Sequence, residues 1–293
     1  MFLSILSSRI RIVIFVTSLI IGANACAVTN DCSNFFGVEA RGCLTLAKNS
    51  PSKGSPQALI NFFKRSNSPV EQIAKGLKDT FNLNAQQVTQ LLADENYSSI
   101  EIAKGIKIVF VGSDQQIAKW LKAAGYNGNE VVAALKNALH SPAGNSASIA
   151  KKLYSASVSQ VAQWLKSANY SLLEVIPALE RIESDNQKMM QALKNSFNLQ
   201  VGQLLEALFK AKEIITHQNC SAARCLEPAR WLKNIGYMQK DVISSLKKYY
   251  NINVSAAYDI GKSIFKANNV DIQQTLAAVG YTPQQILSVI HAK

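Results

Sequence analysis

The hydrophobic positions of this chain recur at helical spacing between short polar interruptions. In the segment 130–139 (EVVAALKNAL), Val131, Leu135 and Leu139 fall on one stripe, whereas Lys136 and Asn137 fall off it. Such a stripe is typical of an amphipathic helix with one face in a core. Similar patterns recur in EVIPALERI (174–182) and DVISSLKKYY (241–250). The chain is therefore predicted to consist of successive helices without strands.

A short motif, Leu-x-x-x-Gly/Asn-Tyr, interrupts these stripes at 92–97, 121–126, 165–170, 232–237 and 276–281. Glycine and asparagine most readily adopt the positive φ that ends a helix, and the residue after them then packs on the last turn. We therefore predict helix ends at the following Gly/Asn-Tyr pairs: Asn96 and Tyr97, Gly125 and Tyr126, Asn169 and Tyr170, Gly236 and Tyr237, and Gly280 and Tyr281.

A new helix is predicted to begin directly after most of these tyrosines. Four are followed by a capping residue with Glu or Gln three positions later, as in Ser98 and Glu101. In such a capping box the two side chains satisfy free N–H groups of the first helical turn. Each Gly/Asn-Tyr pair, called a corner below, is thus interpreted as a tight connection between two helices.

These repeated corners predict an all-α fold, an irregular array of stacked helical hairpins resembling an α-solenoid. Because the spacing between copies is uneven, a compact multi-helix bundle is the alternative. Five segments are expected: a signal peptide (1–25), a Cys-bearing N-terminal segment and linker (26–56), helical repeats (57–183), an irregular insertion with a cysteine pair (184–228) and C-terminal helical repeats (229–293).

The N-terminus has the features of a secretory signal peptide. Arg9 and Arg11 precede an apolar run at 12–22, and Ala23-Asn24-Ala25 fits a cleavage site. A retained membrane anchor is the alternative, although the run is shorter than the roughly 20 residues that span a bilayer. We expect an exported bacterial protein that is periplasmic, envelope-associated or secreted.

The cysteines fit an oxidising compartment, where closely spaced pairs form disulfides. We predict pairing of Cys32 with Cys43 and of Cys220 with Cys225. Cleavage after Ala25 would leave Cys26 as the first residue, the position that is lipidated in bacterial lipoproteins, whereas cleavage after Ala27 would remove this cysteine.

Charge points to the kind of partner. The formal net charge of +12 favours an anionic macromolecule, which can be an acidic protein, an envelope polymer, an acidic lipid or a nucleic acid. The chain lacks a nucleophile elbow, a dinucleotide fingerprint and a zinc-helix motif. His217, Cys220 and Cys225 would supply only three metal ligands. We therefore expect no enzyme activity, catalytic residue, metal, cofactor or small-molecule substrate.

A repeated Trp-Leu-Lys precedes three of the corners, and its two outer residues are the candidate binding surface. Stacked along one groove, they would suit anionic or planar ligands. The alternative places the tryptophans in the core between repeats and the lysines in solvent. The candidate residues are Trp120, Lys122, Trp164, Lys166, Trp231 and Lys233.

Together these features predict an exported, non-enzymatic helical-repeat protein that binds a macromolecular, anionic partner. One alternative is a lipid-anchored structural or assembly protein of the envelope. The other is a secreted effector or toxin that acts on another cell.

Overall fold

The computed structural model describes residues 54–211 and 222–292, and every regular element within these ranges is a helix. The predicted all-α fold is confirmed. None of the described helices is long and apolar enough to cross a membrane. The predicted signal peptide and Cys26, Cys32, Cys43, His217 and Cys220 lie outside the described residues, so the predictions made for them stay predictions.

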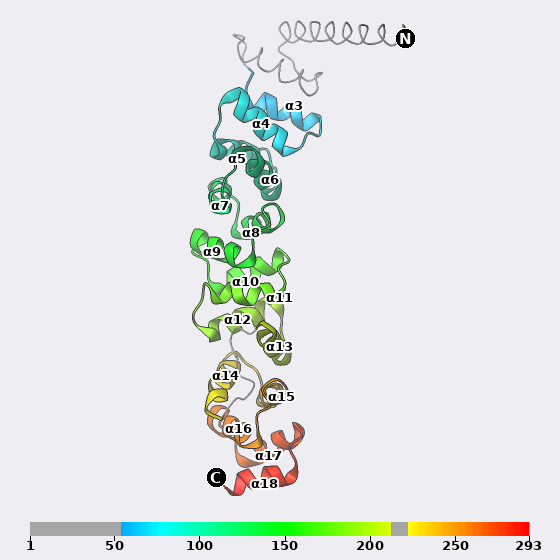
Figure 1. The fold of residues 1–293 in the computed structure, drawn as a ribbon, viewed down its shortest axis with the longest axis vertical. Coiled ribbons are helices and arrows are strands. Elements are labelled where there is room, and N and C mark those ends of the chain that lie inside the picture. Colours follow the sequence, from blue (N-terminus) through cyan, green and yellow to red (C-terminus); the bar gives the residue numbers. More distant parts are fainter. Residues whose placement is uncertain (1–53, 212–221, 293) are drawn as a thin grey trace, which may run out of the picture. The chain divides into compact units, whose positions relative to one another are not determined.

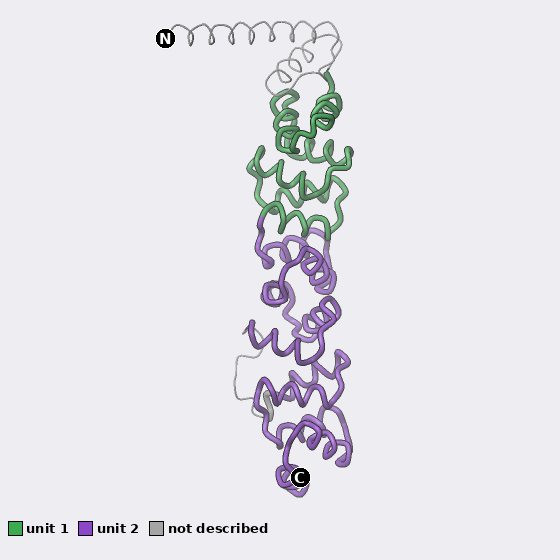
Figure 2. The backbone as a smooth tube through the Cα atoms, turned by 90° about the vertical axis from the view of Figure 1, so that its right-hand side faces the viewer, with its two compact units in different colours: residues 1–139 green, residues 140–293 purple. Residues whose placement is uncertain are grey.

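The chain divides into two units, residues 1–139 and 140–293 (Figure 2). The first contains α3 (Pro56–Arg65), α4 (Val70–Phe81), α5 (Ala85–Asp94), α6 (Ser99–Phe110), α7 (Asp114–Ala123) and α8 (Gly128–Asn137). The second contains α9 (Ala143–Tyr154), α10 (Val158–Ser167), α11 (Leu172–Glu180), α12 (Asn186–Phe197), α13 (Val201–Ala211), α14 (Ala222–Asn234), α15 (Gln239–Tyr250), α16 (Val254–Asp259), the π-helix η1 (Ile260–Ile264), α17 (Asn269–Ala278) and α18 (Pro283–His291).

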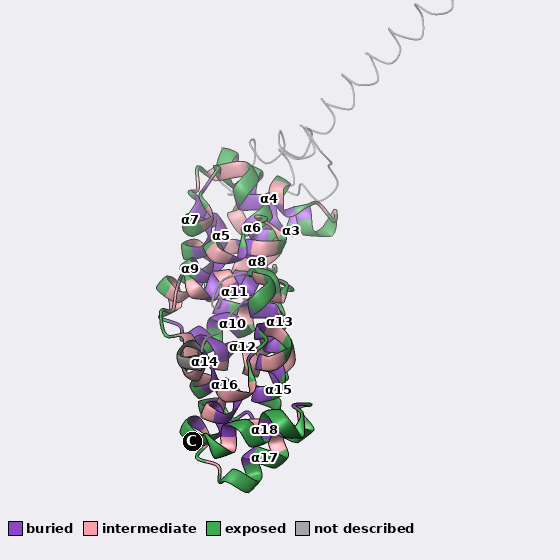
Figure 3. Cartoon of the chain, turned by 60° about the horizontal axis from the view of Figure 1, so that its bottom comes forward, coloured by how far each residue is buried: buried purple, intermediate pink, exposed green. Residues whose placement is uncertain are grey.

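Within each unit the helices stack in two rows (Figure 1). A helix packs on its next-but-one neighbour in sequence, as α4 does on α6 and α6 on α8, or α10 on α12 and α12 on α14. The buried side chains lie on the faces that meet these neighbours, and exposed residues lie on the outer faces (Figure 3). Each unit is therefore a stacked helical array of the predicted kind.

The corners have the predicted geometry. The backbone φ angle is +62° at Asn96, +97° at Gly125, +65° at Asn169, +87° at Gly236 and +84° at Gly280. At every corner the tyrosine N–H donates to the carbonyl of the leucine five residues earlier, at 3.0–3.1 Å. Those leucines are at most 1% exposed. This is the Schellman ending expected from the motif.

The helix starts also agree with the capping residues predicted from the sequence. Capping boxes open α6, α8, α11 and α18, the helices that follow corners, and also α5, α7 and α10. The side chain of Met238 cannot cap α15. Because both ends of these helices are specified locally, the array needs only short connections.

A second kind of helix end was not anticipated. Five helices of twelve residues, α4, α6, α9, α12 and α15, end on an aromatic residue. The next residue then adopts the left-handed conformation with φ between +47° and +54°. The residues in this conformation are Asn82, Val111, Ser155, Asn198 and Asn251.

The structure differs from the predicted organisation in two places. The stretch 184–228, expected to be irregular, contains the regular helices α12 and α13 and the start of α14. The corner motif did not predict these helices, because α12 ends at Phe197-Asn198 and thus lacks a Gly/Asn-Tyr corner. In addition, the division between the two units falls inside the segment 57–183, which was predicted as helical repeats.

We expect Gly125→Val to lower the free energy of unfolding by about 1–2 kcal/mol, because the left-handed conformation is unfavourable for residues with a Cβ. A Cβ at Gly125 would meet no atom within 4 Å, so the loss would report the backbone conformation alone. Ala124→Ser, at the preceding residue, should cost less than about 0.5 kcal/mol. Urea denaturation measures both, and equal losses would contradict the assigned role of the glycine.

Candidate binding surface

The corner tyrosines connect neighbouring helix ends as well as closing their own helix. The hydroxyl of Tyr237 donates to the carbonyl oxygen of Leu199, and that of Tyr281 to the carbonyl oxygen of Ile252, each at 2.6 Å. The hydroxyl of Tyr126 reaches the carbonyl of Tyr97 in the same way. Each of these tyrosines therefore links its corner to an earlier turn of the chain.

Lysines make the complementary connection. Lys78, in the last turn of α4, donates to the carbonyl oxygen of Val109 near the end of α6, at 3.0 Å. Lys247 of α15 donates to the carbonyl of Gly280, just after α17, at 2.9 Å. The last carbonyls of a helix have no partner within the helix and carry partial negative charge. A lysine from one helix thus caps the C-terminal end of the next helix in its row.

An aromatic ring lies beneath most of these ammonium groups. The distance from Nζ to the ring centroid is 4.1 Å for Lys247 and Tyr281 and 4.4 Å for Lys194 and Tyr237. Cation–π attraction adds to the capping bond at such distances. Further examples are Lys64 with Tyr97, Lys78 with Phe110, Lys166 with Phe197 and Lys233 with Phe265.

The tyrosine and lysine bonds can be reciprocal, as two examples from the second unit show. Lys247 donates to the end of α17, and Tyr281, beyond α17, donates back to Ile252, just after α15. The same exchange joins α12 and α14, where Lys194 donates to the carbonyl of Ile235 at 2.5 Å and Tyr237 donates to Leu199. We call each reciprocal pair a lysine–tyrosine clamp.

These contacts show what the lysines of the candidate surface do within the chain. Lys166 donates to the carbonyl of Ser196 and Lys233 to that of Ile264, both at 2.6 Å. Lys122 is exposed on α7. Lys166 and Lys233 therefore hold neighbouring helices together, a role that was not expected from the sequence.

The three tryptophans are half-buried. Trp164 packs edge-to-face against Tyr154, with ring centroids 5.7 Å apart. Trp120 lies so close to Gly112 that a Cβ there would stand 2.9 Å from Cζ3 of the indole. These neighbours precede the helices that carry the tryptophans. Trp120 therefore packs on the connection before α7 and Trp164 on the end of α9, while the groove interpretation stays a prediction.

Burial raises the pKa of Tyr237 and of Tyr281 to about 12. The unfolded chain would ionise these phenols near pH 10. Since the native state keeps the protons longer, their contribution to stability is complete below pH 10 and is lost as the pH rises to about 12. We expect the free energy of unfolding of the double variant Tyr237→Phe/Tyr281→Phe to fall less steeply with pH over this range than that of the parent chain. Urea midpoints at several pH values measure the slope, and an unchanged slope would contradict this role.

One open hollow of about 380 Å³ lies in the first unit, between α3, α4 and α6. Its charged lining consists of Lys64, Glu71, Glu101 and Lys104. Lys64 is paired with Glu95 at 3.1 Å, and Glu101 is held in the capping box of α6. Two of these four charged side chains are thus already engaged within the first unit.

Nothing in the described ranges groups histidine, cysteine or acidic side chains as a metal ion would require. Cys225 is fully buried in α14. Comparison with known proteins adds no assignment. No protein-family model matches the chain, and no curated protein matches it. The surface must therefore be judged from its own chemistry.

Its chemistry is set by the cations left over from these contacts. Several described carboxylates occupy capping boxes or ion pairs, as Glu130, Glu174 and Glu206 do. By contrast, a set of exposed basic side chains on both units makes no hydrogen bond or ion pair with a described residue. They are Arg65, Lys75, Lys104, Lys119, Lys152, Arg181, Arg230, Lys240 and Lys266.

Proposed function

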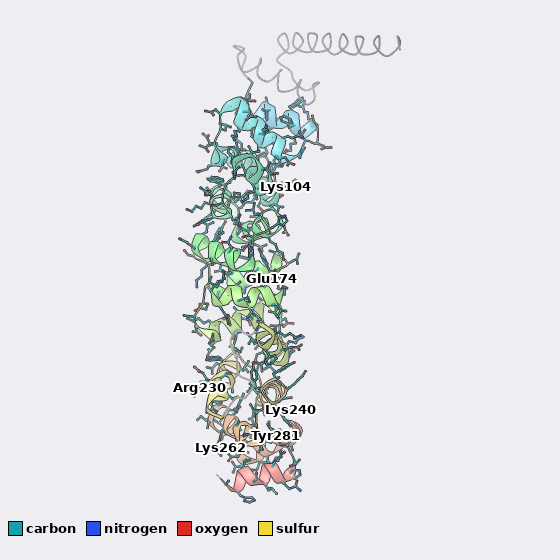
Figure 4. The ribbon with its side chains drawn as sticks, viewed as in Figure 1. Lys104, Glu174, Arg230, Lys240, Lys262 and Tyr281 are labelled. Carbon is teal, nitrogen blue, oxygen red and sulfur yellow. The ribbon has the colours of Figure 1, made fainter. Side chains whose placement is uncertain are left out.

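We propose that this chain is an exported, non-enzymatic helical-repeat protein that binds an anionic macromolecular partner across its helical surface. The observation that carries the proposal is the set of unpaired exposed cations. Lys104 projects from α6 of the first unit, and Arg230 and Lys240 project from α14 and α15 of the second unit (Figure 4). Cations that lie on more than one helix of a unit favour an extended polyanion over a small ligand in one pocket.

The internal contacts strengthen this interpretation. The capping lysines, such as Lys78 and Lys247, are already bound to carbonyl oxygens, so their number alone says little about a partner. The side chains of Arg230 and Lys240 are not bound to carbonyl oxygens in this way. Binding through the unpaired cations would leave the helix contacts intact.

The test is binding of the chain without its predicted signal peptide to dextran sulfate at increasing NaCl concentration. We expect the affinity to fall steeply with salt, because the attraction between exposed charges is screened. Arg230→Gln/Lys240→Gln should weaken binding severalfold. The control Lys188→Gln/Lys210→Gln removes the same charge from lysines paired with Asp185 and Glu206, and should weaken binding less. Binding that ignores salt, or equal losses in the two variants, would contradict the proposal.

Export and the disulfides belong to the same proposal. We expect a mature chain that begins near residue 26 and contains the pairs Cys32–Cys43 and Cys220–Cys225, because an oxidising compartment favours such pairs. Intact mass before and after reduction tests this. A lipid on Cys26 would instead support the envelope-anchored alternative, and a mature chain acting on other cells would support the effector alternative.

A further inference from the structure

The five twelve-residue helices end with the same backbone geometry, but the residue types at their ends differ. Two positions can be compared: the third residue from the end and the left-handed residue after it. In four helices both are polar, with Asp79 and Asn82 on α4, Lys152 and Ser155 on α9, Asn195 and Asn198 on α12, and Lys248 and Asn251 on α15. In α6 they are Ile108 and Val111, which are 58% and 83% exposed.

Val111 is unfavourable where it stands. Its φ of +52° is in the left-handed region, which asparagine tolerates and which a β-branched residue rarely adopts. Its side chain is also largely in water, so burial within the first unit does not offset this strain. Strained residues that persist in a fold are candidates for a functional role. Neither position of the pair is therefore explained by stability.

Three lysines lie on α6 or bond to the carbonyl oxygens at its C-terminal end. Lys107 donates to the carbonyl of Gly112 at 3.1 Å and lies 3.5 Å from Asp114. Lys78 of α4 reaches the carbonyl of Val109. Lys104, one turn before Ile108, is exposed and unpaired within the described part of the chain (Figure 4). A lysine has three donors, so the ammonium groups that cap carbonyls can still bind an anion.

We propose that the end of α6, with Ile108 and Val111, inserts into the surface of an anionic lipid membrane while Lys78, Lys104 and Lys107 contact the headgroups. This rests on the proposed anionic partner and names its class. Membranes offer hydrocarbon directly beneath negative charge, and interfacial binding sums both contributions. Polysaccharides and nucleic acids have no such layer for two exposed aliphatic side chains.

A protein partner fits these residues less well. The residues that dominate protein interfaces are tryptophan, tyrosine and arginine in well-packed pockets, and valine is under-represented among them. Ile108 and Val111 stand at a helix end, and neither lines the hollow described in the first unit. Such a protruding pair needs a deformable partner rather than a shaped one.

The test is sedimentation of the unlipidated chain 26–293 with phosphatidylcholine vesicles, made with and without phosphatidylglycerol. The variant Ile108→Asn/Val111→Asn installs the residues that α12 has at the same positions. We expect its binding to phosphatidylglycerol vesicles to fall at least about tenfold, as loss of two buried aliphatic side chains implies. Its melting temperature should not fall, because asparagine relieves the strain at Val111.

Val270→Asn is the matched control, since Val270 is 62% exposed on α17 and should not affect binding. A double variant that binds like the parent, or a parent that binds both vesicle types equally, would overturn the proposal. Dextran sulfate separates the two proposals. A chain that binds this polymer but no vesicles contradicts only the membrane site, whereas a chain that binds neither contradicts both.

Discussion

Leu165→Ala is expected to destabilise the second unit by about 2–5 kcal/mol, the usual cost of removing a fully buried leucine. Leu165 is inaccessible to solvent, and its carbonyl accepts the N–H of Tyr170 in the corner that ends α10. Its loss leaves a cavity beneath that corner, next to α12, on which α10 packs. Urea denaturation followed by circular dichroism measures the change.

Ser167→Ala is the control for this experiment, because Ser167 is exposed in the last turn of the same helix. It should change the free energy of unfolding by less than about 0.5 kcal/mol. Similar losses in the two variants would mean that Leu165 does not belong to a packed core. A transition that splits in two in Leu165→Ala alone would show that the array unfolds in parts.

The second large effect is expected from Lys247→Met, which should cost about 1.5 kcal/mol because it removes a charged donor from helix-terminal carbonyls. Lys247 donates to the carbonyls of Val279 and Gly280, and lies over the ring of Tyr281. Methionine keeps the length and apolar stem of the side chain. The loss therefore reports the ammonium group, and thermal and urea denaturation measure it.

The neighbouring residue supplies the control. Lys248→Met changes the net charge equally, but Lys248 is exposed, caps none of the described helices and lies 4.9 Å from the ring centroid of Tyr249. It should cost less than about 0.5 kcal/mol. In a double-mutant cycle, Lys247→Met and Tyr281→Phe should be non-additive, since the two side chains touch. Additive losses, or equal losses at 247 and 248, would contradict the lysine–tyrosine clamp.

Local features explain why most of the fold could be predicted. The φ of Gly125 and the capping box of Ser98 and Glu101 depend on residues within one helical turn, so the local amino-acid sequence is enough to predict them. Helix ends such as Phe197-Asn198 follow a different local rule, with a lysine three residues before the aromatic, as at Lys194. That signal also occurs at Lys78, Phe81 and Asn82, and could have been found.

The candidate surface was harder to predict because its chemistry depends on contacts distant in sequence. The sequence does not distinguish Lys166 from Lys104, yet Lys166 caps α12 and Lys104 has no described partner. Whether a lysine is free is decided by the helix that lies next to it in the row. The apolar pair on α6 becomes conspicuous only when its position is compared with Asn195 and Asn198 on α12.

The capping lysines also impose an order on the assembly of the chain. Lys78 finds its acceptor at Val109 and Lys233 at Ile264, each 31 residues further along the sequence. A chain that emerges from its N-terminus would present each of these lysines before the carbonyl that it binds. Each such lysine would lack its acceptor until the next helix in its row had followed, and the end of that later helix would find its capping group already in place, so the array would close progressively toward the C-terminus.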